Sequence, residues 1–236
     1  MRLDKYLADM QIGTRSQVKD YIRKGCISIN GEVIKKPEYK IDEKNDAIEY
    51  NGKIILYQKY RYYMLHKPAG VVTATQDNID KTVMDLFGAE AGKDLFPVGR
   101  LDKDTEGLLI VTNDGELAHN LLSPKKHVPK TYYVECEGTI TSTDIDMLET
   151  GVDIGDDKIT LPAKAELIDS DSSRYRLKLT IMEGRFHQVK RMIKAINGTV
   201  VYLKRISMGQ VVLDDKLEKG TYRELTSAEV ESLQQR

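Results

Sequence analysis

The chain has 236 residues, a formal net charge of −1 and 40% hydrophobic residues. This length accommodates one large domain or two modest ones, and the hydrophobic content supports a packed core. The near-neutral charge argues against a protein that coats nucleic acid with its whole surface, but it permits local basic faces. No apolar run approaches the roughly 18 residues of a membrane helix, and no signal peptide is recognisable. We therefore expect a cytoplasmic protein that makes no contact with a membrane.

The first 60 residues predict a small basic module. Residues 1–40 carry nine Lys and Arg side chains against five Asp and Glu. Leu3, Leu7 and Met10 recur at helical spacing. Thr14-Arg15-Ser16-Gln17 is a capping box that opens a second helix, and Asn30-Gly31 is the strongest short signal for a β-hairpin. Two helices and a hairpin indicate an α+β module.

The same residues resemble the S4 RNA-binding domain. The matching pattern is Arg-Leu-Asp-x-x-Leu from residue 2, Thr-Arg-Ser from residue 14, and Ile-x-x-Gly-x-Ile-x-Ile-Asn-Gly from residue 22. The resemblance implies that five residues face RNA phosphates: Arg2, Lys5, Arg15, Ser16 and Lys19. Clustered cations and hydroxyls at a helix start suit phosphate oxygens. Without the resemblance, a solvated basic helix face explains the same residues.

A larger domain is expected after a short linker at residues 57–61. The predicted boundaries are 1–60 for the S4-like module and 61–236 for the second domain. Residues 62–65, 108–111, 130–138 and 174–181 have strand patterns, and residues 189–196 form an amphipathic helix. Thr226-Ser227-Ala228-Glu229 is a capping box for a C-terminal helix. We predict an α+β fold with a mixed, mostly antiparallel sheet.

One polar loop and the strand after it carry the most specific motif in the chain. Residues 99–115 read Gly-Arg-Leu-Asp-Lys-Asp-Thr-Glu-Gly-Leu-Leu-Ile-Val-Thr-Asn-Asp-Gly. A charged loop beside a buried strand presents a carboxylate to a ligand from a rigid base. More than ten positions match the signature of RNA pseudouridine synthases of the RsuA/RluA type, which this chain resembles. The resemblance implies that Asp102 is the catalytic residue.

Two further segments resemble motifs of the same family. Lys130-Thr131-Tyr132-Tyr133-Val134 resembles the second motif, whose tyrosine stacks on the target base. We align that tyrosine to Tyr132; since neighbours on a strand face opposite sides, we expect either Tyr132 or Tyr133 to be core. Glu183-Gly184-Arg185-Phe186-His187-Gln188-Val189-Lys190-Arg191-Met192 resembles the third motif, and Lys67-Pro68-Ala69-Gly70 also recurs in the family near the active cleft.

The third motif supplies the remaining site predictions. Residues 174–205 hold nine cations against one carboxylate, the most basic stretch of the chain. We predict that Arg185 pairs with Asp102, because an opposite charge favours the ionised carboxylate in a desolvated site. We expect four other residues in or near the motifs to contact RNA, namely Arg100, His187, Lys190 and Arg191.

Isomerising uridine to pseudouridine is redox-neutral and needs no group donor, so we predict neither a cofactor nor a metal. The reaction needs an ionised carboxylate in a closed pocket and a surface that holds the base. Asp102 supplies the carboxylate, either as a covalent nucleophile or as a base at the 2′ position of the sugar. The target base must leave its stack to reach such a pocket. Loops and bulges are the RNA sites where that costs least.

Two other function classes compete with the synthase. A non-catalytic S4-type RNA-binding or ribosome-assembly protein is disfavoured by the intact Asp102, Tyr132 and Arg185. A glycoside hydrolase needs a second carboxylate across the scissile bond, which Asp104 or Glu106 would have to supply. The basic surface and the S4-like module disfavour a sugar substrate.

The RNA target is predicted from three features: the S4-like module, the absence of a long basic tail, and the sequence of the third motif with His187 and Lys190. By these features the chain resembles RsuA-type members of the family more than its other members, and this resemblance implies a single uridine of 16S rRNA as the target, with 23S rRNA or tRNA as the alternatives. The expected partner is 16S rRNA or an assembly intermediate of the small subunit, bound by a monomer.

Overall fold

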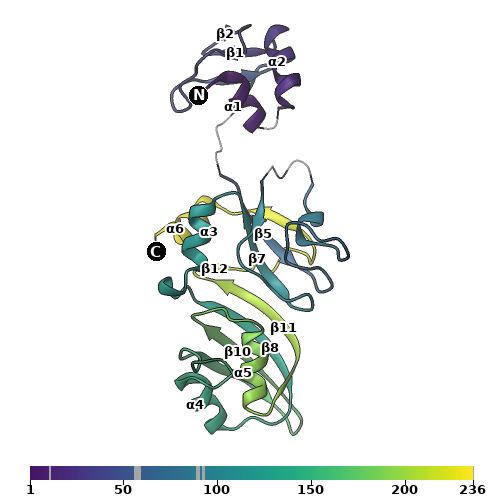
Figure 1. The fold of residues 1–236 in the computed structure, drawn as a ribbon, viewed down its shortest axis with the longest axis vertical. Coiled ribbons are helices and arrows are strands. Elements are labelled where there is room, and N and C mark those ends of the chain that lie inside the picture. Colours follow the sequence, from purple (N-terminus) through teal and green to yellow (C-terminus); the bar gives the residue numbers. More distant parts are fainter. Residues whose placement is uncertain (11, 56–59, 89–90, 92–93, 236) are drawn as a thin grey trace. The chain divides into compact units, whose positions relative to one another are not determined.

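A computed structural model describes the chain except for residues 11, 56–59, 89–90, 92–93 and 236. The described residues form two compact units, Met1–Arg61 and Tyr62–Arg236 (Figure 1). Most of the expected linker, residues 57–59, lies outside the described residues. Among the described helices, none has the length and apolarity that crossing a membrane requires.

The first unit packs two helices against a small antiparallel sheet. The helices are α1 (Leu3–Asp9) and α2 (Arg15–Arg23), and the strand order is β2 (Glu32–Val33), β1 (Ile27–Ile29), β3 (Ile48–Tyr50) and β4 (Lys53–Ile54). The capping box predicted at Thr14 and Gln17 is confirmed, since each side chain binds the other residue's backbone N–H. Asn30 and Gly31 have the positive φ angles of a tight hairpin turn between β1 and β2.

The second unit is built on one large twisted sheet. Its main path within the described residues runs β13 (Tyr222–Glu224), β5 (Tyr62–Lys67), β7 (Glu106–Thr112), β11 (Thr199–Met208), β8 (Lys130–Glu137), β10 (Arg174–Ile181) and β9 (Lys164–Ser170). Two short strands join it, β12 (Val211–Val212) beside β11 and β6 (Phe96–Pro97) beside β7. β7 and β11 run parallel and the other pairs are antiparallel. The predicted mixed, mostly antiparallel sheet is confirmed.

Helices cover both faces of this sheet. The helical segments are η1 (Val83–Leu86), α3 (Gly115–Leu122), η3 (Pro124–Lys126), α4 (Ser142–Thr150), α5 (Gln188–Ala195) and α6 (Ser227–Gln234). One apolar cluster joins Leu108 and Ile110 to α3 and α6, and another joins Leu109 and Val111 to the side of the sheet that carries α5. Alternate side chains of β7 therefore enter different cores, which explains why every residue of this strand is buried.

A close crossing of β7 and β11 positions the loop that precedes β7. Gly107 pairs with Arg205, and its φ angle is +104°. A Cβ atom at Gly107 would lie 2.2 Å from the carbonyl oxygen of Arg205. Glycine is required here because any side chain would push the two strands apart. The loop carrying Asp102 is thereby held close to the β8–β11 part of the sheet.

Candidate active site

A cavity of about 980 Å³ lies in the second unit, where the loop before β7 faces β8, β11 and the start of α5. It brings together six residues that the sequence singled out: Arg100, Asp102, Tyr132, Arg185, His187 and Lys190. The Asp102 side chain is 27% exposed, so its carboxylate is reachable but largely shielded from solvent. Arg191 is not among the lining residues.

A buried lysine holds the backbone of the loop that carries Asp102. Lys67, at the end of β5, is 0% exposed, and its ammonium donates to the backbone oxygens of Asp102 (2.9 Å) and Thr105 (2.8 Å). It makes longer hydrogen bonds to the carbonyl oxygens of Pro68 and Lys103. Burial lowers the pKa of Lys67 to about 8. This lysine therefore holds the loop with a charge buried among carbonyl dipoles.

A threonine and a glycine complete this support. The Thr73 hydroxyl donates to the carbonyl oxygen of Leu101 at 2.7 Å and accepts from the Leu101 N–H at 3.1 Å. The Gly70 N–H donates to the carbonyl oxygen of Lys103 at 2.7 Å. The backbone on both sides of Asp102 is thus held by groups outside the loop, which limits movement of the carboxylate.

Two side chains from the third motif, a lysine and a histidine, face Asp102. The Lys190 Nζ lies 3.2 Å from Oδ2 of Asp102, and Nε2 of His187 lies 3.6 Å from Oδ1. Lys190 also binds Asp104 at 2.6 Å. Burial by itself would lower the pKa of the Lys190 ammonium, but hydrogen bonds and charge from Asp104 and Asp102 raise it. Lys190 therefore stays protonated beside the carboxylate.

The predicted pairing of Arg185 with Asp102 is wrong. The Arg185 guanidinium binds Glu183 at 3.0 Å and Asp156 at 3.5 Å, and it donates to the carbonyl oxygens of Lys158 and Ile159. It lines the cavity, but it ties the loop before β9 to the start of α5. The counter-charge of Asp102 is Lys190, which lies five residues further along the motif.

Arg191 has a similar anchoring position. Its guanidinium donates to the carbonyl oxygens of Ile154 and Phe186 and pairs with Asp156. Arg185 and Arg191 thus both bind the loop at residues 154–159. The expected RNA contact of Arg191 has to compete with these bonds, whereas Arg100 is exposed at the cavity.

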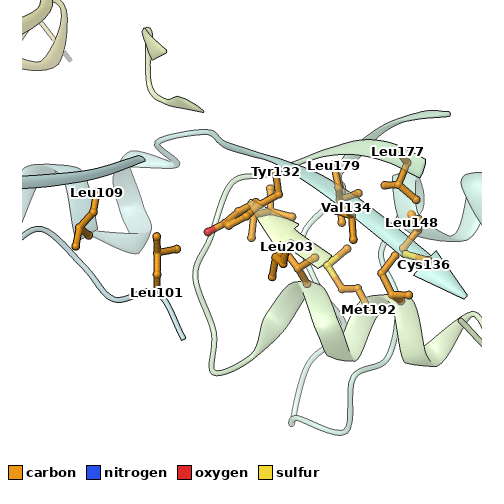
Figure 2. Packing of buried hydrophobic residues seen from close by; sticks show 14 of the residues in the cluster. Leu101, Leu109, Tyr132, Val134, Cys136, Leu148, Leu177, Leu179, Met192 and Leu203 are labelled. Carbon is orange, nitrogen blue, oxygen red and sulfur yellow. The ribbon is translucent and has the colours of Figure 1, made fainter. Parts of the chain in front are cut away.

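Tyr132 lies at the border between the hydrophobic core and the cavity. It is 8% exposed, belongs to the main core cluster and lines the cavity. In Figure 2 its ring extends from β8 toward Leu101, and its hydroxyl group is the end nearest to Leu101. Tyr133 points to the other side of the sheet, where its hydroxyl donates to Glu135. Of the two tyrosines, Tyr132 is the one in the core.

The predicted phosphate-facing residues of the first unit differ in whether their side chains already bind another residue of the protein. Arg2 makes a two-point contact with the fully buried Asp4 carboxylate, and Arg15 lies 3.6 Å from it. Burial would raise the pKa of Asp4, but Arg2 and Arg15 hold it below its usual range. Lys5 and Ser16 are exposed and Lys19 is half-buried. Arg2 and Arg15 therefore pair with the buried Asp4 carboxylate in addition to any contact with a ligand.

Sequence reasoning missed three cationic positions. Lys67 was visible in the Lys-Pro-x-Gly pattern, but nothing in the sequence indicated that it binds the Asp102 loop. Lys130 and Arg205 also line the cavity and are buried, although each type of side chain is normally exposed. Among the described residues, no three His, Cys, Asp or Glu side chains are grouped so that they could hold a metal ion.

Comparison with known proteins identifies the family of each unit. Residues 61–195 match the family model described as RNA pseudouridylate synthase, and residues 1–48 match the S4 domain. The chain belongs to the RNA pseudouridine synthase family. The synthase is therefore an isomerase that acts on RNA, with an S4 domain at its N-terminal side.

Relatives of the synthase match over nearly the whole chain. It is 49% identical to the uncharacterized RNA pseudouridine synthase YtzG of Bacillus subtilis, with 99% of this chain and 98% of the relative covered. It is 39% identical to ribosomal small subunit pseudouridine synthase A of Haemophilus influenzae, with 99% of each covered. A solved pseudouridylate synthase structure is 38% identical, covers 99% of both chains and has a TM-score of 0.70.

Proposed function

We propose that this synthase converts one uridine of 16S rRNA, U516 in the reference numbering, to pseudouridine, with Asp102 as the catalytic residue. The observation that carries the proposal is the Asp102 carboxylate, held on a fixed loop that lines the cavity, with Lys190 at 3.2 Å. Relatives that share 37–39% identity over full length bear the name ribosomal small subunit pseudouridine synthase A. That name supports the choice of RNA.

The reaction assigns a role to each group. The N1–C1′ bond of the uridine breaks, the base turns, C5 bonds to C1′, and the proton of C5 is replaced by one at N1. Asp102 either attacks covalently or removes a proton at the 2′ position, and both routes need its ionised form. Lys190 supplies the charge that favours this form. Tyr132 offers an aromatic face to the flipped base.

We also propose that the two units have different roles. Residues 1–60 serve as the RNA-binding module, and residues 61–236 carry the chemistry. Lys5, Ser16 and Lys19 are exposed or half-exposed on the helices of the first unit, where they suit phosphate contacts. The substrate is 16S rRNA or an assembly intermediate of the small subunit, bound by a monomer in the cytoplasm.

The test uses a strain that lacks the gene. Pseudouridine in all rRNA and tRNA is mapped in this strain after complementation with the wild type or with Asp102→Asn. We expect the wild type to restore a single 16S signal and Asp102→Asn to restore none, while both proteins accumulate equally. Restoration of a 23S or tRNA signal instead would refute the 16S target, and activity of Asp102→Asn would refute its catalytic role.

A further inference from the structure

Two buried cations line the cavity without an acidic partner among the described residues. Arg205 is 2% exposed and Lys130 is 8% exposed. Counting described residues, the guanidinium of Arg205 makes one hydrogen bond, from Nε to the carbonyl oxygen of Leu108, and its Nη2 is buried without an acceptor. Within the part of the chain that the structure describes, Lys130 donates only to the carbonyl oxygen of Val128. Burying charge in this way is costly unless something else accepts these donors.

The strand register places both cations beside Tyr132. Arg205 on β11 pairs directly with Tyr132 on β8, so the two side chains lie on the same face of the sheet. Lys130 is two residues before Tyr132 and therefore shares that face. All three residues line the cavity that contains Asp102. A base that lies against the Tyr132 ring consequently has its edge next to these donors.

The two cations also act on each other. Burial, and then the neighbouring Arg205 guanidinium, lower the pKa of Lys130 to about 8. Neither desolvation nor like-charge repulsion is relieved by a carboxylate of the described residues. The arrangement is therefore complete only when an electron-rich ligand enters the cavity.

We propose that Arg205 and Lys130 form a binding site for the carbonyl oxygens of the target uracil, where they stabilise the negative charge that the base acquires during the reaction. The inference rests on the proposed function and adds a group that acts on the base. When the N1–C1′ bond breaks, its electron pair passes to N1 and is delocalised onto O2 and O4. When C5 bonds to C1′, the electron pair released by the broken N1–C1′ bond becomes the pair of the new C5–C1′ bond. C5 then loses a proton and N1 gains one, so the reaction is balanced.

Arg205 and Lys130 are donors that the fold already holds in place. Donors buried and oriented before the reaction stabilise developing charge strongly, because they need no reorganisation when that charge appears. Arg205 is held by its bond to Leu108 on β7, the strand that follows the Asp102 loop. The same strand crossing thus connects the guanidinium to the strand that follows the loop of the carboxylate, and both groups line one cavity.

The phosphate of the target nucleotide is the other source of acceptor oxygens. The test therefore compares a 16S rRNA fragment that contains the target uridine with the same fragment carrying an abasic site there, which keeps the phosphate but lacks the carbonyl oxygens. Equilibrium binding to both RNAs is measured for the wild type, Arg205→Gln and Lys130→Met. Arg174→Gln serves as the control, since Arg174 is an exposed arginine at the start of β10. Thermal unfolding confirms that each variant is folded.

We expect the wild type and Arg174→Gln to bind the uridine RNA about tenfold or more tightly than the abasic RNA. Arg205→Gln should lose most of this difference while binding the abasic RNA as the wild type does. Its single-turnover rate on saturating RNA should fall by a similar or larger factor. Lys130→Met should behave in the same direction, and it provides the test if Arg205→Gln does not fold.

Two results would overturn the proposal. An equal loss of affinity for both RNAs would show that the cations bind phosphate, and an unchanged preference for the uridine RNA would show that they do not bind the base. Failure of the underlying function is recognised separately, because the wild type would then form no pseudouridine in the uridine RNA.

Discussion

The Lys190 ammonium lies between two carboxylates of the same loop, 3.2 Å from Asp102 and 2.6 Å from Asp104. It is the cation nearest the predicted catalytic group, and it comes from the first turn of α5. One lysine thus joins the loop before β7 to the helix after β10. Loss of its charge should affect the reaction more than loss of any other cation in the third motif.

We expect Lys190→Gln to lower the single-turnover rate by about tenfold to a hundredfold, because it removes the positive charge beside the Asp102 carboxylate. The rate of pseudouridine formation is measured with saturating RNA, so that weaker binding does not contribute. Lys194→Gln is the matched control, since Lys194 is exposed in the last turn of the same helix. A wild-type rate for Lys190→Gln would show that the ion pair has no part in catalysis.

Lys67→Met should destabilise the second unit by about 2–4 kcal/mol, because it leaves the backbone oxygens of the Asp102 loop without their buried donor. Urea unfolding followed by circular dichroism measures this loss. The fully folded variant should also be much less active, since Asp102 is then no longer held in place. Normal activity together with normal stability would contradict the supporting role of Lys67.

Gly107→Ala should destabilise the protein by about 3 kcal/mol or more, because the new Cβ meets the Arg205 carbonyl oxygen at 2.2 Å where β7 and β11 cross. Gly115→Ala is the matched control: no atom lies within 4 Å of the position that its added Cβ would take, and its φ is not positive. That control should change stability by only about 0.5 kcal/mol. Similar unfolding midpoints for the two variants would contradict the close crossing.

The pair formed by Glu229 and Arg223 should make stability depend on acid pH. The hydrogen bond from Arg223 lowers the pKa of Glu229 to about 2 from 4.5. A carboxyl group whose pKa is depressed by folding stabilises the protein above its unfolded pKa, and this contribution is lost as the pH falls through the folded value. The extra stability of wild type over Glu229→Gln should therefore be constant above about pH 5 and shrink between about pH 4.5 and 2.

Unfolding free energies of the two proteins, measured with urea at several pH values, check this expectation. Glutamine preserves the capping-box geometry with Thr226, so the comparison isolates the charge. An energy difference that stays the same down to about pH 2 would show that the ion pair contributes nothing that depends on titration.

Much of this protein was determined by local sequence. The capping boxes at Thr14 and Thr226 and the hairpin at Asn30-Gly31 formed as predicted, because each depends on residues only a few positions apart. The alternating pattern of residues 174–181 likewise predicted the strand β10. The motif around Asp102 identified the family, because its match needs only the order of residues along the chain.

Only the tertiary structure decided which cation faces Asp102. Arg185 and Lys190 belong to the same motif, and the sequence favoured the wrong one. Between them His187 adopts a left-handed backbone conformation with φ of +48°, and α5 begins directly after it. This turn directs Arg185 toward the loop at residues 156–159 and Lys190 toward Asp102. The partnership of distant charges depends on how strands and helices pack, and the spacing of residues in a motif does not contain that information.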